Sequence, residues 1–250
     1  MIEHFEVKKV EKEKLPIEVV EEFFRLWREK EVKKLEREED EHRLYMDVYV
    51  RKKHHHSEPY VREAEKRIRM AMQREESLRY KMIEMEKKFP WLTAAEQYYG
   101  KALQIIALNE KLEELKKGGK IKEAETIQEQ LKTESEKLKE IGKNLPRDVR
   151  ERLKREALRD TIDAQEYGAY SKALQTRDMT TLENMRKKNP YLLLVEMYVA
   201  TANRYLQLRE KKPPSWEIEA KYLEARLEKI RDKLPDWLIK KLEMQLREGK

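Results

Sequence analysis

The chain has 250 residues, of which 43% are charged and only 39% hydrophobic, fewer than a compact sphere of this size requires. The absence of cysteine excludes disulfides and thiolate chemistry, and it fits an intracellular protein. With 57 basic and 50 acidic residues, the net charge of +7 is a small difference, as expected for opposite charges interleaved on solvated helix faces. Six glycines and eight prolines leave few turns, so the composition predicts an elongated all-α protein with long helices.

Neither a membrane span nor a targeting peptide is predicted. The longest apolar run, residues 191–195, is far shorter than the roughly 18–20 residues that cross a bilayer. Residues 1–14 contain acidic side chains and no apolar stretch, unlike a signal or transit peptide.

Residues 16–50 are predicted to form one long N-terminal helical arm, because Pro16 suits a first helical turn. Apolar residues gather near its two ends, whereas its middle is almost wholly charged and offers no apolar face. A helix that is polar all round either bridges solvent or is held by charge pairs. We therefore expect the arm to lie outside the core and to dock a partner through exposed aromatic side chains, the candidates being Phe23, Phe24, Trp27, Tyr45 and Tyr49.

A break in the helical pattern follows the arm and predicts a linker, so that residues 1–58 form a first region of arm and linker. Arg51, Lys52 and Lys53 are its candidate basic patch. Three adjacent histidines come next, but neighbours in an extended loop point in different directions and no cysteine completes a zinc site. A solvated basic linker is favoured over a metal centre.

The rest of the chain contains a repeat. Residues 85–111 align without a gap with residues 185–211, and 11 of the 27 positions are identical. Leu-Pro at 145–146 matches Leu-Pro at 234–235 with an offset of 89 residues. Such self-similarity indicates repeated supersecondary units, against the alternative that two amphipathic helices converged in composition. We therefore predict two related helical units, residues 59–155 and residues 156–250.

Each unit is predicted to contain an antiparallel helical hairpin. In the first, a heptad seam over residues 61–89 precedes a helix at 91–117, which Gly118-Gly119 turns back into a helix at 121–141. In the second, residues 191–211 pair with 216–233.

A connecting helix at 147–175 and a terminal helix at 235–248 are predicted to complete the chain. A short helix capped by Thr180 or Thr181 ends at Asn189. Tyr98 and Tyr198 are expected to occupy equivalent buried positions, and no strand is predicted.

No catalytic constellation is recognisable. All five histidines lie in the first 56 residues, and there is no Gly-x-Ser-x-Gly elbow and no glycine-rich phosphate loop. A single Glu-x-x-His, Glu39 to His42, lacks the second copy that a di-iron bundle needs. We expect no enzyme activity, no cofactor and no metal site.

These features predict a non-enzymatic scaffold subunit whose partners are other protein subunits of a large assembly. A mitochondrial assembly, such as an ATP synthase or a respiratory complex, is the expected type. This expectation follows from the general type of protein, and no particular residue encodes it. The alternative is a peripheral ribosomal protein, mitochondrial or otherwise, that neutralises RNA phosphates with its Lys/Arg-rich helices. Salt distinguishes the two, because phosphate contacts weaken steeply between about 50 and 200 mM salt.

Overall fold

The computed structural model describes residues 15–51 and 58–248, which form helices joined by short turns and contain no strand. The elements in chain order are α1 (Pro16–Tyr45), the π-helical turn η1 (Met46–Val50), α2 (Glu58–Lys88), α3 (Leu92–Lys117), α4 (Ile121–Gly142), α5 (Arg147–Ala157), α6 (Ala164–Thr176), α7 (Met179–Lys188), α8 (Leu192–Lys211), α9 (Trp216–Arg231) and α10 (Asp236–Glu248). The predicted all-α fold with a long N-terminal helix is confirmed.

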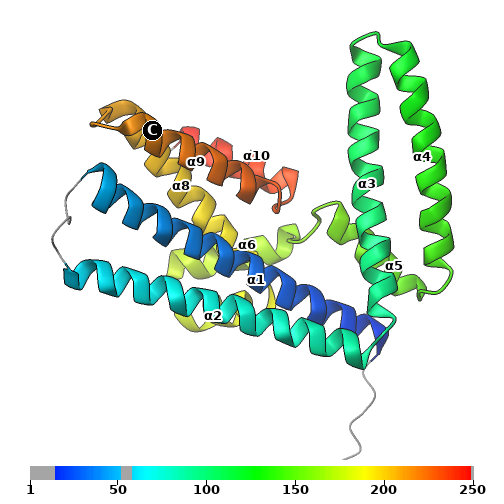
Figure 1. Ribbon diagram of the computed structural model, residues 1–250, viewed down its shortest axis with the longest axis horizontal. Helices are drawn as coiled ribbons and strands as arrows, with labels where there is room; N and C mark the ends of the chain where they lie inside the picture. The colour runs from blue at the N-terminus through cyan, green and yellow to red at the C-terminus, as the bar shows by residue number, and fades with distance from the viewer. Residues whose placement is uncertain (1–14, 52–57, 249–250) are drawn as a thin grey trace, which may run out of the picture.

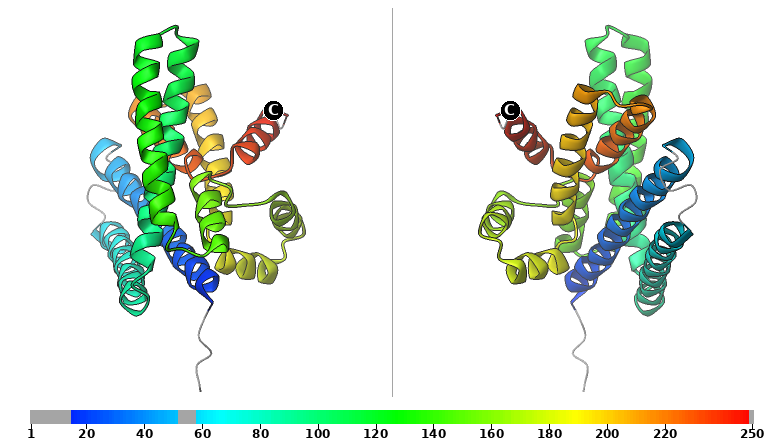
Figure 2. Two further views of the ribbon diagram at one scale, coloured as in Figure 1. Left: turned by 90° about the vertical axis from the view of Figure 1, so that its right-hand side faces the viewer. Right: turned by 90° about the vertical axis from the view of Figure 1, so that its left-hand side faces the viewer.

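The molecule has an uneven, elongated outline. In Figure 1 the long helices α1 and α2 lie side by side along the lower edge, and the α3/α4 hairpin stands out from the body at one end. Helices α8, α9 and α10 gather at the other end. The two turned views in Figure 2 show the same projection of α3 and α4 beyond the remaining helices. Both predicted hairpins, α3 with α4 and α8 with α9, are present.

The two units share their local geometry at the turn that opens each hairpin. In the first unit Pro90 lies in this turn, and the Leu92 amide donates to the Phe89 carbonyl at 2.9 Å. In the second unit Pro190 lies in the same kind of turn, and the Leu192 amide donates to the Asn189 carbonyl at 3.1 Å. Proline suits this position because a first helical turn does not need its missing amide hydrogen.

The buried side chains also correspond. Tyr98 and Tyr198 are 3% and 4% exposed, and both lie in the core of their own unit, as predicted. Leu153 of α5 and Leu242 of α10 are buried at matching places after the shared Leu-Pro step. The first unit therefore consists of α2 to α5, and the corresponding helices of the second are α7 to α10.

The expectation that the N-terminal arm lies outside the core is wrong. Phe23 and Phe24 of α1 are buried in the first unit's core, and Val32 and Leu35 are buried in the core of the second. The middle of α1 contributes only these two aliphatic residues, but ion pairs with α9 and its C-terminal turn hold its charged faces, as in Glu31–Lys233 at 2.6 Å and Glu38–Lys229 at 2.8 Å. A helix that is polar all round either bridges solvent or is held by charge pairs, and α1 is held by charge pairs.

The predicted connecting helix over 147–175 is two helices, α5 and α6. Arg159 takes a left-handed conformation with φ of 60°, and the Asp160 amide donates back to the Arg155 carbonyl at 2.9 Å. This is a C-terminal capping turn that normally uses glycine, and a non-glycine residue there costs roughly 1–2 kcal/mol. The break was not predicted because neither glycine nor proline marks it.

The predicted caps of α7 are also corrected. Asp178, and neither of the two threonines, caps this helix, because its carboxylate accepts from the Thr181 amide at 3.0 Å and from the Thr181 hydroxyl at 2.6 Å. Aspartate is among the preferred N-cap residues, because its oxygen satisfies one of the free amides of the first turn.

Candidate docking cleft between the two units

A buried ion pair marks the place where α1 crosses from one unit to the other. Arg28 of α1 donates through Nε to Oε1 of Glu156 on α5 at 2.9 Å, and its Nη2 donates to the other oxygen. Both side chains are buried. Arg152, one turn before Glu156, donates to the same carboxylate at 3.0 Å. A carboxylate removed from water needs such charge-assisted partners, and the bidentate fork of arginine fits it.

Asn189 extends this network into the second unit. Its Oδ1 accepts from Nη1 of Arg28 at 3.3 Å, and its Nδ2 donates to the Thr161 carbonyl at 2.8 Å. The aligned residue in the first unit is Phe89, so the asparagine is one of the places where the repeats differ. The network therefore joins α1, α5 and the turn before α8.

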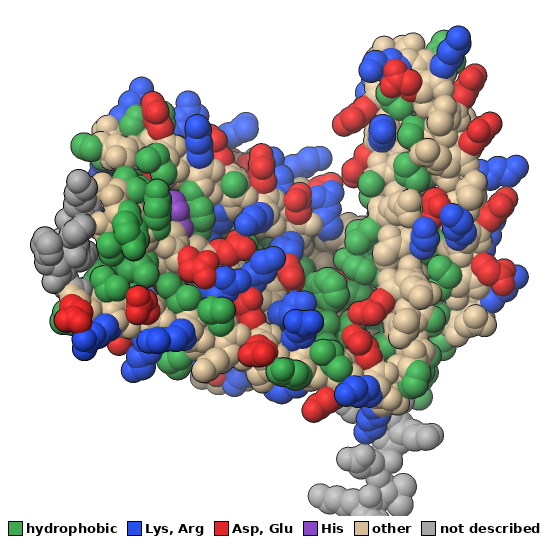
Figure 3. All heavy atoms as spheres, in the orientation of Figure 1, with side chains coloured by type: hydrophobic (Ala, Val, Ile, Leu, Met, Phe, Trp, Pro, Cys, Tyr) green, Lys and Arg blue, Asp and Glu red, His purple; other side chains and the backbone are tan. Residues whose placement is uncertain are grey.

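Beside this network lies a cleft of about 510 Å³, between α1, α3 and the C-terminal turns of α5 and α9. Its volume lies within the roughly 300–1,000 Å³ of ligand pockets. Its walls are largely apolar, formed by Phe23, Phe24, Trp27, Tyr99, Leu103 and Tyr191. Figure 3 shows hydrophobic side chains at the foot of the projecting α3/α4 hairpin, in the notch between the hairpin and the body. We call this space the cleft.

Most charged side chains around the cleft are already paired. The pairs are Glu31 with Lys233 at 2.6 Å, Glu156 with Arg28, and Arg159 with Asp236 at 3.4 Å. Two lining carboxylates, Glu96 and Asp232, form no ion pair with any of the described residues. Burial and the nearby Glu86 raise the pKa of Glu96, although Lys30 acts in the opposite direction. The cleft therefore has an excess of negative charge.

Two tyrosines of the cleft stay protonated over the whole physiological range. Burial and the negative charge of Glu156 raise the pKa of Tyr99 to about 12, and the same two causes raise the pKa of Tyr191. Neither hydroxyl has a hydrogen-bond partner among the described residues. Both can therefore donate to, or accept from, a bound group.

A wider polar groove of about 750 Å³ lies on the other side of the Arg28–Glu156 pair. It contains several charged side chains, but Arg25 is paired with Glu22 and Glu29, and Arg28 and Arg152 are paired with Glu156. Its apolar lining is sparse, so the aromatic cleft is the better candidate for docking.

The aromatic docking candidates of α1 separate into three groups. Phe23 and Phe24 are buried in the chain's own core, which corrects the expectation that they are exposed, and only their edges border the cleft. Trp27 is partly buried and lines the cleft. Tyr45 and Tyr49 are 50% and 69% exposed, and their rings meet with centroids 5.9 Å apart at the opposite end of α1.

The predicted basic patch is not a free cationic surface at Arg51. This side chain bonds to Asp47 at 3.0 Å and also to Glu219 of α9. An acid on each side neutralises it, which the sequence could not show because Glu219 is distant in the chain. Lys52, Lys53 and the three adjacent histidines lie outside the described residues.

The single Glu-x-x-His is part of a second buried polar network. Glu39 accepts from Arg226 at 2.7 Å, and the ring of His42 stacks on Tyr222 with centroids 3.6 Å apart. Arginine partners therefore occupy Glu39. Within residues 15–51 and 58–248, no three His, Asp or Glu side chains gather in a way that could hold a metal ion.

In that same part of the chain, no helix combines the length and the apolar character that a membrane span requires. Comparisons with known protein families, with characterised proteins and with solved structures found no match to this chain.

Proposed function

We propose that this chain is a non-enzymatic connecting subunit that docks other proteins of a larger assembly. The observation that carries the proposal is the projecting α3/α4 hairpin with an apolar, partly open cleft at its foot. The 26 residues of α3 correspond to about 39 Å of helix, longer than the hairpin needs for its contacts with the body. Such a projection offers a surface to neighbours at little cost to the core.

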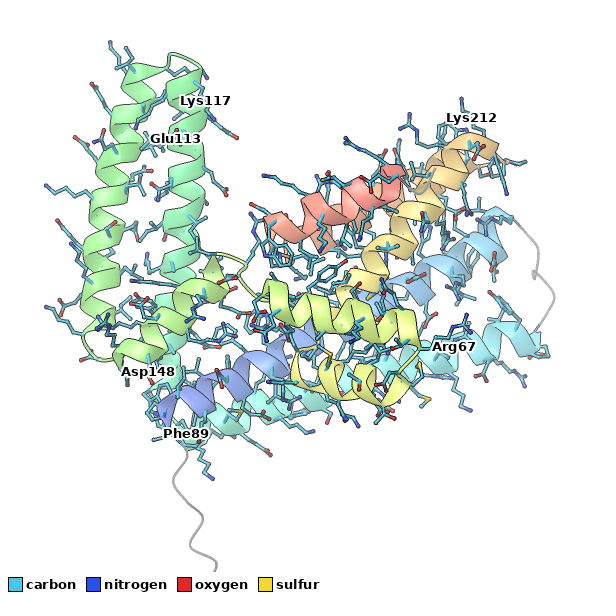
Figure 4. All side chains as sticks on the ribbon, turned by 180° about the vertical axis from the view of Figure 1, so that it is seen from behind. Arg67, Phe89, Glu113, Lys117, Asp148 and Lys212 are labelled. Atoms are coloured by element: carbon cyan, nitrogen blue, oxygen red, sulfur yellow. The ribbon has the colours of Figure 1, made fainter. Side chains whose placement is uncertain are left out.

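The outer part of the hairpin has only a small core of its own. Four buried residues, Leu112, Leu115, Ala124 and Ile127, form it. Figure 4 labels Glu113 and Lys117 near the outer end, far from Phe89 and Asp148 at the foot. Charged residues cover the outer half, and Ile121 at the tip is largely exposed. This composition suits a solvated spacer that meets a partner along its length or at its base.

RNA binding is the second candidate, and the charge arrangement favours it less. Many lysines on exposed faces sit beside an acid three or four residues away, as in Lys143 with Glu140 and Lys187 with Glu183. A surface that binds phosphates normally segregates its positive charge. The non-enzymatic part of the proposal rests on the sequence, which lacks cysteine and any recognisable catalytic motif.

The test is native purification of the tagged full chain from its source cells, with and without nuclease, at about 50 and about 200 mM salt. We expect stoichiometric protein partners that survive both treatments. The variant Leu103→Glu places a charge in the cleft at a residue that is 40% exposed, and it should lose these partners. Ile218→Glu on α9, at a similar exposure, is the matched control and should keep them.

Partners lost on nuclease treatment, or lost at the higher salt, would favour the RNA-binding alternative. Equal loss in both variants would show that the cleft has no special part in docking.

A further inference from the structure

The two units surround one aligned glutamate, Glu96 or Glu196, with different partners, and Glu96 lines the cleft. In the second unit, Glu196 accepts from Arg186 and from the Tyr170 hydroxyl, and Arg186 also donates to Tyr170 at 2.8 Å. In the first unit the aligned glutamate is Glu96, but Glu86 occupies the place of the arginine. The same carboxylate position therefore has its cation in one unit and a second acid in the other.

The walls around Glu96 suit a flat cation. Trp27, Tyr99 and Tyr191 line the cleft with it, and aromatic faces attract cations electrostatically. Tyr191 is only 6% exposed, yet its hydroxyl has no hydrogen-bond partner among the described residues. This hydroxyl can therefore donate a hydrogen bond to, or accept one from, a bound group. The acids that act on this hydroxyl, Glu156 and Glu31, are themselves lining residues of the cleft.

Gly100 adds a further indication. It lies within α3, where glycine costs about 1 kcal/mol relative to alanine, and a Cβ built there meets no atom within 4 Å. Packing inside the chain therefore gives no reason for glycine, and the aligned residue in the second unit is Ala200. Gly100 lines the cleft, so the missing side chain lets another backbone approach α3 closely.

We propose that the cleft binds an arginine side chain of a partner protein, whose guanidinium group takes the place beside Glu96 that Arg186 occupies beside Glu196. Arginine fits better than lysine, because its planar guanidinium bonds a carboxylate through two N–H groups and stacks on an aromatic ring. The volume exceeds that of one side chain, so the neighbouring apolar part of the partner covers Leu103 and Gly100. This inference names the partner chemistry of the docking site proposed above.

Lys30 is the competitor already present. Its ammonium group lies 4.7 Å from the centroid of the Trp27 ring, although it forms no ion pair with Glu96. A guanidinium group that stacks on the same face of Trp27 must displace it. Removing this lysine should therefore strengthen arginine binding, whereas removing the charge of Glu96 should weaken it.

The experiment titrates N-acetyl-arginine methylamide into the full chain and follows the indole N–H signal of Trp27 by NMR, assigned with Trp27→Phe. We expect a saturable shift, at least roughly tenfold weaker binding in Glu96→Gln, and abolished binding in Glu86→Arg, which supplies the internal cation. Lys30→Met should bind more tightly. The matched control is Glu110→Gln, an exposed glutamate of α3 outside the cleft, and it should bind as the original chain does.

The corresponding norleucine compound tests whether charge matters. Equal binding of the norleucine and arginine probes, or unchanged arginine binding in Glu96→Gln, would overturn the guanidinium site. Absence of any saturable Trp27 shift would do the same. Each of these results leaves the docking proposal standing, because native purification with Leu103→Glu tests that proposal separately.

Discussion

The two units build the same turn and the same helix pair but use one shared glutamate differently. Glu196 is locked into a polar cluster with Arg186 and Tyr170, whereas Glu96 faces Glu86 and the open cleft. The turn prolines and the buried Tyr98 and Tyr198 stabilise the shared turn and helix pair in both units. A position beside such a scaffold can therefore change from structural pairing to binding without altering the fold.

The largest expected effect concerns the residue that links the units. Arg28→Leu removes the main partner of Glu156 and leaves a buried carboxylate short of charge compensation, so the free energy of unfolding should fall by about 3–5 kcal/mol. Urea unfolding followed by circular dichroism measures it. Lys143→Leu, which breaks an exposed pair with Glu140, should change nothing measurable. Similar losses in the two variants would mean that the buried pair does not hold the junction.

The next effect tests whether the repeat positions are energetically alike. Tyr98→Ala and Tyr198→Ala should each lower the free energy of unfolding by about 3–5 kcal/mol, because each deletes a buried aromatic ring. Substitution of each tyrosine by phenylalanine should distinguish the two positions. Tyr198→Phe loses a bond to Glu243 at 3.2 Å and should cost about 1 kcal/mol, whereas the Tyr98 hydroxyl has no such bond among the described residues. Equal costs for the two phenylalanine variants would contradict this difference.

A smaller effect separates the two glutamates directly. Glu196→Gln weakens bonds to Arg186 and Tyr170 and should cost about 1–2 kcal/mol. Glu96→Gln should change the free energy of unfolding by less than about 0.5 kcal/mol, or raise it slightly. Because the folded state raises the pKa of Glu96, its ionised form opposes folding, so any gain should grow as the pH rises through that pKa. Thermal unfolding of Glu96→Gln at several pH values measures this effect. A loss of stability in the variant would show that Glu96 is structurally paired.

The smallest effect is a pH dependence where α1 packs against α9 of the second unit. Burial and the positive charge of Arg204 and Arg51 lower the pKa of His42 in the fold, while Glu219 and Glu39 act in the opposite direction. Neutral His42 therefore makes its full contribution to the free energy of unfolding above pH 6.5, the ordinary pKa of histidine. This contribution is lost as the pH falls below 6.5, because the unfolded chain then binds the proton more readily than the folded one.

His42→Phe keeps a ring beside Tyr222 and removes the titration. Between about pH 7 and pH 5 the original chain should therefore lose more stability than this variant. Parallel pH profiles for the two proteins would show that His42 is not responsible.

The sequence by itself determined the helical class, the two hairpins and the repeat. Helix stops such as Gly118-Gly119, the prolines at the shared turns and the spacing of apolar residues are local signals, and each acts within a few residues of itself. The identical positions in the two units also predicted that Tyr98 and Tyr198 are buried. The sequence did not predict the cleft, although Trp27, one of the docking candidates, lines it.

Tertiary structure alone decided where α1 lies and what its charges do. Arg28 and Glu156 are 128 residues apart, and Arg226 donates to the Leu35 carbonyl across 191 residues, so no local pattern announces either contact. From the sequence alone, an arginine on a charged helix is predicted to be solvated, because its carboxylate partner is distant in the chain. The break at Arg159 was hidden for a similar reason, because a residue with an ordinary helical preference was held in a left-handed turn by its surroundings.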